Sequence, residues 1–95
     1  MNDLPLPAFE HAILAMHGAQ AIYSHRIGVA ESFEGQPVWE GQVLVFELVG
    51  HPTASRVYAW EVDGEVTAVL EEPPVASAAD AVRASIMADE SVPRG

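Results

Sequence analysis

The sequence predicts a small α+β domain, built as a two-layer sandwich in the order helix, four-stranded antiparallel meander, helix. Three features support this fold class: helical spacing of apolar residues over 8–24, alternating segments over 26–70, and a capped helical pattern from Ser77 onward. The 95 residues, of which 49% are hydrophobic, suit one globular domain over 1–95. We expect residues 1–7 to form an extended lead-in and residues 91–95 to form a tail.

The predicted first helix has more apolar surface than one buried face requires. Its core stripe, at three- and four-residue spacing, consists of Phe9, Ala12, Ile13, Met16, Ala19, Gln20 and Tyr23. Leu14 lies nearly opposite Phe9 on the helical wheel, and Ile22 lies on a flank of the stripe. This surplus predicts that the helix is covered on a second side or carries a contact surface for a partner.

The segment Val38–Gly50 is predicted to be a strand inside the sheet. Its second half is apolar on both faces, which is typical of a strand that is covered from both sides. The preceding segment, residues 26–34, alternates as a first strand should.

A hairpin is predicted between the segments 56–62 and 65–70. Asp63-Gly64 stands between them, and this pair favours the two-residue turn that needs positive φ at both positions. In this register Tyr58 and Trp60 share one side of the hairpin, which we expect to be open. The other side carries small residues and should lie under the helices.

A second helix is predicted to begin after Ser77. Serine followed three residues later by Asp80 is close to a capping box, in which each side chain bonds a free backbone N–H of the helix start. We expect this helix and the first one to pack on the same face of the sheet.

The composition excludes several classes of function. The formal net charge is -10, with four arginines and no lysine, so the chain has no basic patch to neutralise phosphates or hold an anionic membrane. We therefore expect no direct binding to nucleic acid and no membrane association. The chain has no cysteine, which excludes disulfides, thiol catalysis and cysteine-ligated metals. The start of the chain has no basic lead followed by an apolar run, so we expect a cytoplasmic protein.

No residue pattern points to catalysis, a cofactor or a metal. No two of the histidines, His11, His17, His25 and His51, stand three or four residues apart, as two metal ligands on one helix would. Ser24 and His25 invite a nucleophile-and-base interpretation, but adjacent side chains are expected to point apart, and no glycine-flanked elbow surrounds the serine. We expect no catalytic, cofactor-binding or metal-binding residues.

The leading hypothesis is a non-enzymatic protein-interaction module that forms a homodimer through a sheet face or an edge strand. The candidate interface residues are Leu14, Ile22, Trp39, Tyr58 and Trp60, because surplus apolar residues and exposed aromatics are common anchors of interfaces. Alternatively, the three aromatics complete a hydrophobic core.

Two other functions stay open. An acidic mimic of nucleic acid would present strand glutamates as one negative face to a basic protein partner. A small-ligand carrier or enzyme would use a cup between sheet and helices, with His11 or His25 and a nearby glutamate as its polar groups.

Overall fold

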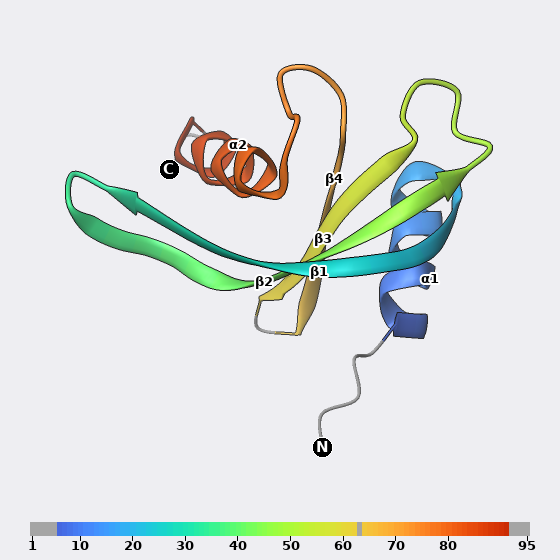
Figure 1. Ribbon diagram of the computed structural model, residues 1–95, viewed down its shortest axis with the longest axis horizontal. Coiled ribbons are helices and arrows are strands. Elements are labelled where there is room, and N and C mark those ends of the chain that lie inside the picture. Colours follow the sequence, from blue (N-terminus) through green and yellow to red (C-terminus); the bar gives the residue numbers. More distant parts are fainter. Residues whose placement is uncertain (1–5, 63, 92–95) are drawn as a thin grey trace.

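The computed structural model describes residues 6–62 and 64–91, and over these residues it confirms the predicted class and order of elements. The helix α1 (Leu6–His17) precedes four strands, and the helix α2 (Ala78–Ser91) follows them. The strands are β1 (Gln20–Phe33), β2 (Gln36–Val49), β3 (Arg56–Val62) and β4 (Glu65–Leu70). They pair antiparallel in the order β1-β2-β3-β4, which is the predicted meander (Figure 1).

The first helix is shorter than predicted. It ends at His17, where the N–H of Gly18 bonds the carbonyl of Leu14 at 2.8 Å and Gly18 adopts a φ of +69°. Glycine reaches this left-handed conformation without strain and is the usual residue just beyond a helix. Gln20 and Tyr23, which fit the helical stripe, therefore belong to β1 instead.

The two-residue hairpin between β3 and β4 is confirmed by its register. Val62 lies opposite Glu65 and Trp60 lies opposite Thr67, with Gly64 at a φ of +82°. Asp63 itself lies outside the described residues, as do residues 1–5 of the predicted lead-in and 92–95 of the predicted tail. Leu6 and Pro7, which the lead-in included, are part of α1, and Ser91 ends α2.

The helices lie on opposite faces of the sheet, which corrects the expectation that they share one face. Alternate residues of β2 show the division: Val43 and Val45 belong to the core on the α2 side, whereas Leu44 and Phe46 belong to the core on the α1 side. Each face of the sheet is thus covered by one helix, so the predicted packing of a helix on the sheet is found on both faces. The physical reason is the doubly apolar β2, because a strand that is apolar on both faces requires a cover on both.

Each helix contributes a small set of side chains to its core. On the α1 side, Phe9 and Ile13 pack on Phe46, and the rings of Phe9 and Phe46 stack at 6.2 Å. On the α2 side, Ala81 and Val82 share one core with Tyr58 and Trp60 of β3. The far halves of β1 and β2 extend beyond the pairing with β3 as a long hairpin, which projects at the left of Figure 1.

Candidate interaction surface

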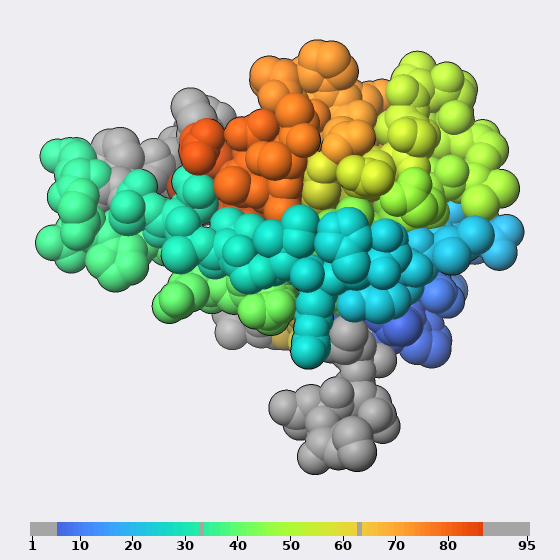
Figure 2. All heavy atoms as spheres, in the orientation of Figure 1, coloured from blue at the N-terminus to red at the C-terminus, as the bar shows by residue number. Residues whose placement is uncertain are grey.

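The outer edge of β1 is the longest unpaired backbone edge of the described sheet. β1 stands at one end of the strand order, runs for 14 residues and pairs only with β2 among the described residues. The opposite edge, β4, has 6 residues, and Nε2 of His17 donates a hydrogen bond to the carbonyl of Ala68 there at 3.1 Å. Figure 2 shows residues of β1 as a continuous band across the face of the molecule, with neither helix over it. Such an edge is a template for pairing with another chain.

A groove between α1 and the start of β1 adjoins this edge. It has a volume of about 380 Å³ and is lined by Pro7, Glu10, His11, Leu14, Gln20, Ala21, Ile22 and Tyr23. Leu14 and Ile22 are each 53% exposed. Leu14 and Ile22, which lie outside the predicted helical stripe, are therefore both exposed. They line the same groove, although Leu14 belongs to α1 and Ile22 to β1.

Beyond Glu10, which lines the groove, the same part of the chain is free of acids. No aspartate or glutamate occurs from His11 to Ala30, although the chain as a whole has a net charge of -10. Glu31, which follows, accepts from Nε of Arg83 at 3.0 Å, and Glu47, opposite Ile22 on β2, accepts from Nε of Arg56 at 3.2 Å. The contact with Glu31 raises the pKa of Arg83. We call the exposed side chains of residues 11–30 together with the outer edge of β1 the α1–β1 surface.

The three aromatic candidates lie in the core, so their predicted exposure is corrected. Tyr58 and Trp60 are each 3% exposed and pack under α2, while Trp39 is half-buried and meets Trp60 edge to face at 5.9 Å. The hairpin side that holds Tyr58 and Trp60 is the α2 side, and the small-residue side lies under α1 as expected. The structure therefore agrees with the alternative interpretation, in which Trp39, Tyr58 and Trp60 complete a hydrophobic core.

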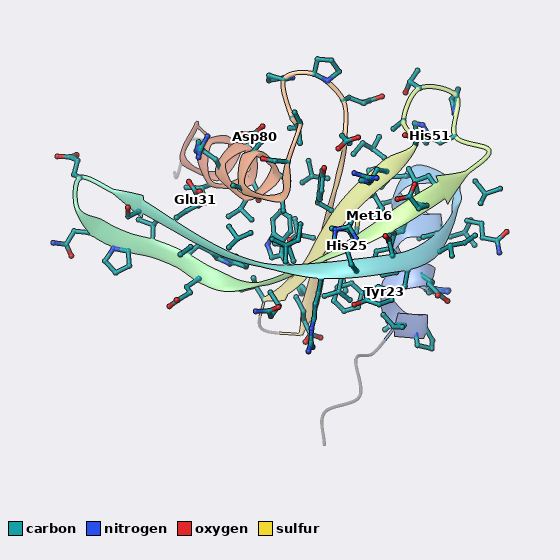
Figure 3. All side chains as sticks on the ribbon, viewed as in Figure 1. Met16, Tyr23, His25, Glu31, His51 and Asp80 are labelled. Carbon is teal, nitrogen blue, oxygen red and sulfur yellow. The ribbon has the colours of Figure 1, made fainter. Side chains whose placement is uncertain are left out.

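Ser24 and His25 are in contact, contrary to the expectation that they point apart. The hydroxyl of Ser24 lies 2.8 Å from Nδ1 of His25, because β1 has a bulge between Tyr23 and His25 that changes its register with β2. Figure 3 shows Tyr23 and His25 on opposite sides of the β1 ribbon. Both members of the pair are exposed, and none of the hydrogen bonds among the described residues links His25 to a carboxylate that would orient it as a base.

A polar cluster lies at the same end of the sheet as the start of β1, because Ile22 pairs with Glu47 and Glu47 pairs with Arg56. The hydroxyl of Tyr58 donates to Glu71, and Nη1 of Arg56 lies 3.9 Å from the same carboxylate. Burial, followed by the hydrogen bond to Glu71, raises the pKa of Tyr58 above its ordinary value. In the loop before β3, Nδ1 of His51 accepts from the backbone N–H groups of Thr53 and Ala54 at 3.2 and 3.0 Å. The hydroxyl of Thr53 also donates to Glu72, and this bond ties the β2–β3 loop to the segment that leads into α2.

The other chemical possibilities find little support in the described residues. No group of three or more histidines and carboxylates lies together there, so no metal centre is formed among them. A groove of about 300 Å³ between α2 and the sheet is lined by Trp39, Trp60, Val62, Thr67, Val82, Ser85 and Ile86, none of which titrates as an acid or base in the neutral range. Two strand glutamates, Glu31 and Glu47, and Glu71 just after β4 are engaged by arginines, which interrupts a continuous negative face.

No family model, curated protein or solved structure matches this chain. None of the helices in the described ranges has the length and apolar character needed to cross a membrane.

Proposed function

We propose that this chain is a non-enzymatic protein-interaction module that forms a homodimer through the α1–β1 surface. The observation that carries the proposal is the coincidence of three properties on that surface: an unpaired strand edge, exposed apolar side chains and, apart from Glu10 at the rim of the groove, a run of residues without acids. Two chains of net charge -10 repel each other, and this surface is where they approach with the least repulsion.

In this proposal the homodimer leaves the acidic surfaces facing outward. Glu40, Glu61 and Glu65 are exposed on the two hairpins and lie outside the α1–β1 surface. A macromolecular partner of the dimer would therefore be basic. The proposal places the module in the cytoplasm, where the disulfides that this chain lacks are rare.

Light scattering across a range of protein concentrations tests the homodimer. We expect the chain to have twice its monomer mass at moderate salt, and Leu14→Ser and Ile22→Ser each to weaken dimerisation roughly tenfold. Burying one exposed aliphatic side chain contributes about 1.5 kcal/mol or more, and 1.4 kcal/mol corresponds to tenfold in affinity.

Val62→Ser is the matched control. Val62 is 44% exposed on β3, so the same loss of apolar area occurs away from the α1–β1 surface and should leave dimerisation unchanged. A chain that stays monomeric at every concentration, or a Val62→Ser variant as impaired as Leu14→Ser, would overturn the proposal.

A further inference from the structure

Resting on the proposed homodimer, we infer that two copies pair β1 with β1, antiparallel, about a two-fold axis at Gly28, to form one continuous eight-stranded sheet. The pairing segment is His25–Glu31. The register of β1 with β2 shifts between Tyr23 and His25 and again between Glu31 and Ser32, so these seven residues are the longest regular run of the strand. Only a regular run offers the uninterrupted series of outward N–H and C=O groups that a further antiparallel strand needs.

Symmetry restricts where the two-fold axis can pass. In a continuous antiparallel sheet, opposite residues project from the same face, and successive residues project from opposite faces. The two-fold axis must therefore pass midway between the two copies of one residue, so that this residue lies opposite itself. Gly28 is the middle of the seven-residue run, so an axis there uses every residue of it.

The charges are compatible with this register and disfavour the register centred on Arg26. With the axis at Gly28, His25 lies opposite Glu31 of the second copy, and Arg26 lies opposite Ala30, so no like charges face each other. An axis at Arg26 would set that arginine against itself and would keep only three residues of the run. Opposed like charges on adjacent strands are destabilising.

The apolar residues of the segment also find partners in this register. Ile27 is 36% exposed, and it comes opposite Val29 of the second copy on the α2 side of the sheet. On the α1 side, Arg26, Gly28 and Ala30 are exposed, so no helix obstructs the approach. Continuing the register toward the start of β1 brings the turn at Glu34 and Gly35 of the second copy near the groove lined by Leu14 and Ile22. One interface thus includes the strand edge and the groove.

Single cysteine substitutions test the register, because the chain contains no cysteine of its own. At the axis, the two Cα atoms of residue 28 would lie roughly 4.5–5.5 Å apart, within the range that a disulfide spans. The two copies of residue 30 would be offset by four residues, roughly 13 Å along the strands, which is too far. We expect Gly28→Cys to form a covalent dimer under mild oxidation at least about tenfold faster than Ala30→Cys, its control on the same face.

A mixture of variants keeps the test valid if Gly28→Cys folds poorly. A Cβ at Gly28 would lie 3.3 Å from Nε2 of Gln42, the movable end of a side chain. Arg26→Cys and Ala30→Cys leave Gly28 intact, and in the proposed register residue 26 faces residue 30. Neither variant alone should cross-link, whereas an equal mixture should.

The outcomes separate this inference from the proposed function. Suppose that light scattering of the reduced protein gives a dimer. Equal cross-linking of Gly28→Cys and Ala30→Cys would then overturn the register and leave the homodimer, and so would the absence of cross-linking in the mixture. A monomer at every concentration would overturn both. Selective cross-linking at residue 28 and in the mixture supports both.

Discussion

Tyr58 is the described side chain whose ionisation is most closely linked to folding. Only 3% of it is exposed, and its hydroxyl donates to Glu71 beside Arg56. Burial is the largest cause of its raised pKa, because the phenolate loses water, and the nearby Glu71 carboxylate adds to the effect. The folded chain therefore holds the Tyr58 proton more tightly than the unfolded chain does.

We predict a tyrosine-dependent loss of stability in alkaline solution. The contribution of Tyr58 is fully present below its unfolded pKa of about 10 and is lost as pH rises through the raised folded pKa. Urea unfolding between pH 8 and 11 should show a steeper decline for the natural protein than for Tyr58→Phe, which cannot ionise at this position. At pH 7 the variant should lose about 1 kcal/mol with the hydrogen bond to Glu71. Identical alkaline slopes for the two proteins would contradict the prediction.

The aromatic side chains show how far sequence reasoning about single residues reaches. The alternation of β3 correctly grouped Tyr58 with Trp60 and separated both from the small residues Val57 and Ala59. It could not say which group is exposed, since both groups are apolar and each suits a helix cover. The ring of Trp39 lies across Gly41, where an added Cβ would be 3.1 Å from the ring. Trp39 and Gly41 are two residues apart, and in a pleated strand such residues lie on the same face of the sheet.

Among the secondary-structure elements, the start of α2 follows its sequence signal closely. The Ser77 hydroxyl accepts from the N–H of Asp80 at 3.1 Å, and the Asp80 carboxylate accepts from the N–H of Ala76 at 3.1 Å. The second bond goes to Ala76 and not to Ser77 itself, a small departure from the capping box. Arg83, one turn on, approaches Asp80 at 3.4 Å and anchors Glu31 of β1.

We predict that Ser77→Ala lowers the free energy of unfolding by about 1 kcal/mol, because the Asp80 N–H loses its acceptor. Ser77→Asp keeps an acceptor and should remain within about 0.5 kcal/mol of the natural protein. Ser32→Ala, an exposed serine on β1, is the control and should also change little. Urea titrations of the three variants would decide the matter, and a Ser77→Ala variant as stable as Ser32→Ala would refute it.

Two elements were predictable from a local signal in the sequence. Asp63-Gly64 predicted the hairpin and Ser77 predicted α2, because turn and cap chemistry acts within four residues. The end of α1 was missed although Gly18 carried the signal, since the apolar spacing continued through it to Tyr23. The placement of the helices on opposite faces depends on tertiary packing, and the doubly apolar second half of β2 was the available indication.

At the scale of the whole chain, only part of the candidate surface could be predicted from the sequence. Leu14 and Ile22 were identified from their position outside the helical stripe, and both are exposed. The rest of the surface depends on β1 being the edge strand, which strand order decides and periodicity does not. The acid-free run from His11 to Ala30 was visible in the sequence, but its meaning depends on α1 and β1 lying side by side.

The charge of the chain leads to a prediction about salt. Two bodies of charge -10, with extents of 38 × 36 × 27 Å, would have centres roughly 25 Å apart in a side-by-side dimer, and in water their unscreened repulsion is about 15 kcal/mol. At 0.1 M salt the Debye length is about 10 Å, which leaves roughly 1–2 kcal/mol of this repulsion, and at 0.5 M almost none remains.

Dimerisation should therefore become roughly ten- to a hundredfold tighter between 50 mM and 500 mM NaCl, measured by light scattering or sedimentation over a dilution series. A complex between this acidic chain and a basic protein should weaken over the same range, because there the screened charges attract. Potassium chloride should act like sodium chloride at equal ionic strength, since screening depends on ionic strength and not on the cation. Dimerisation that weakens as salt rises would show that attractive charge pairs dominate the interface. The α1–β1 surface would then not be the dimer interface.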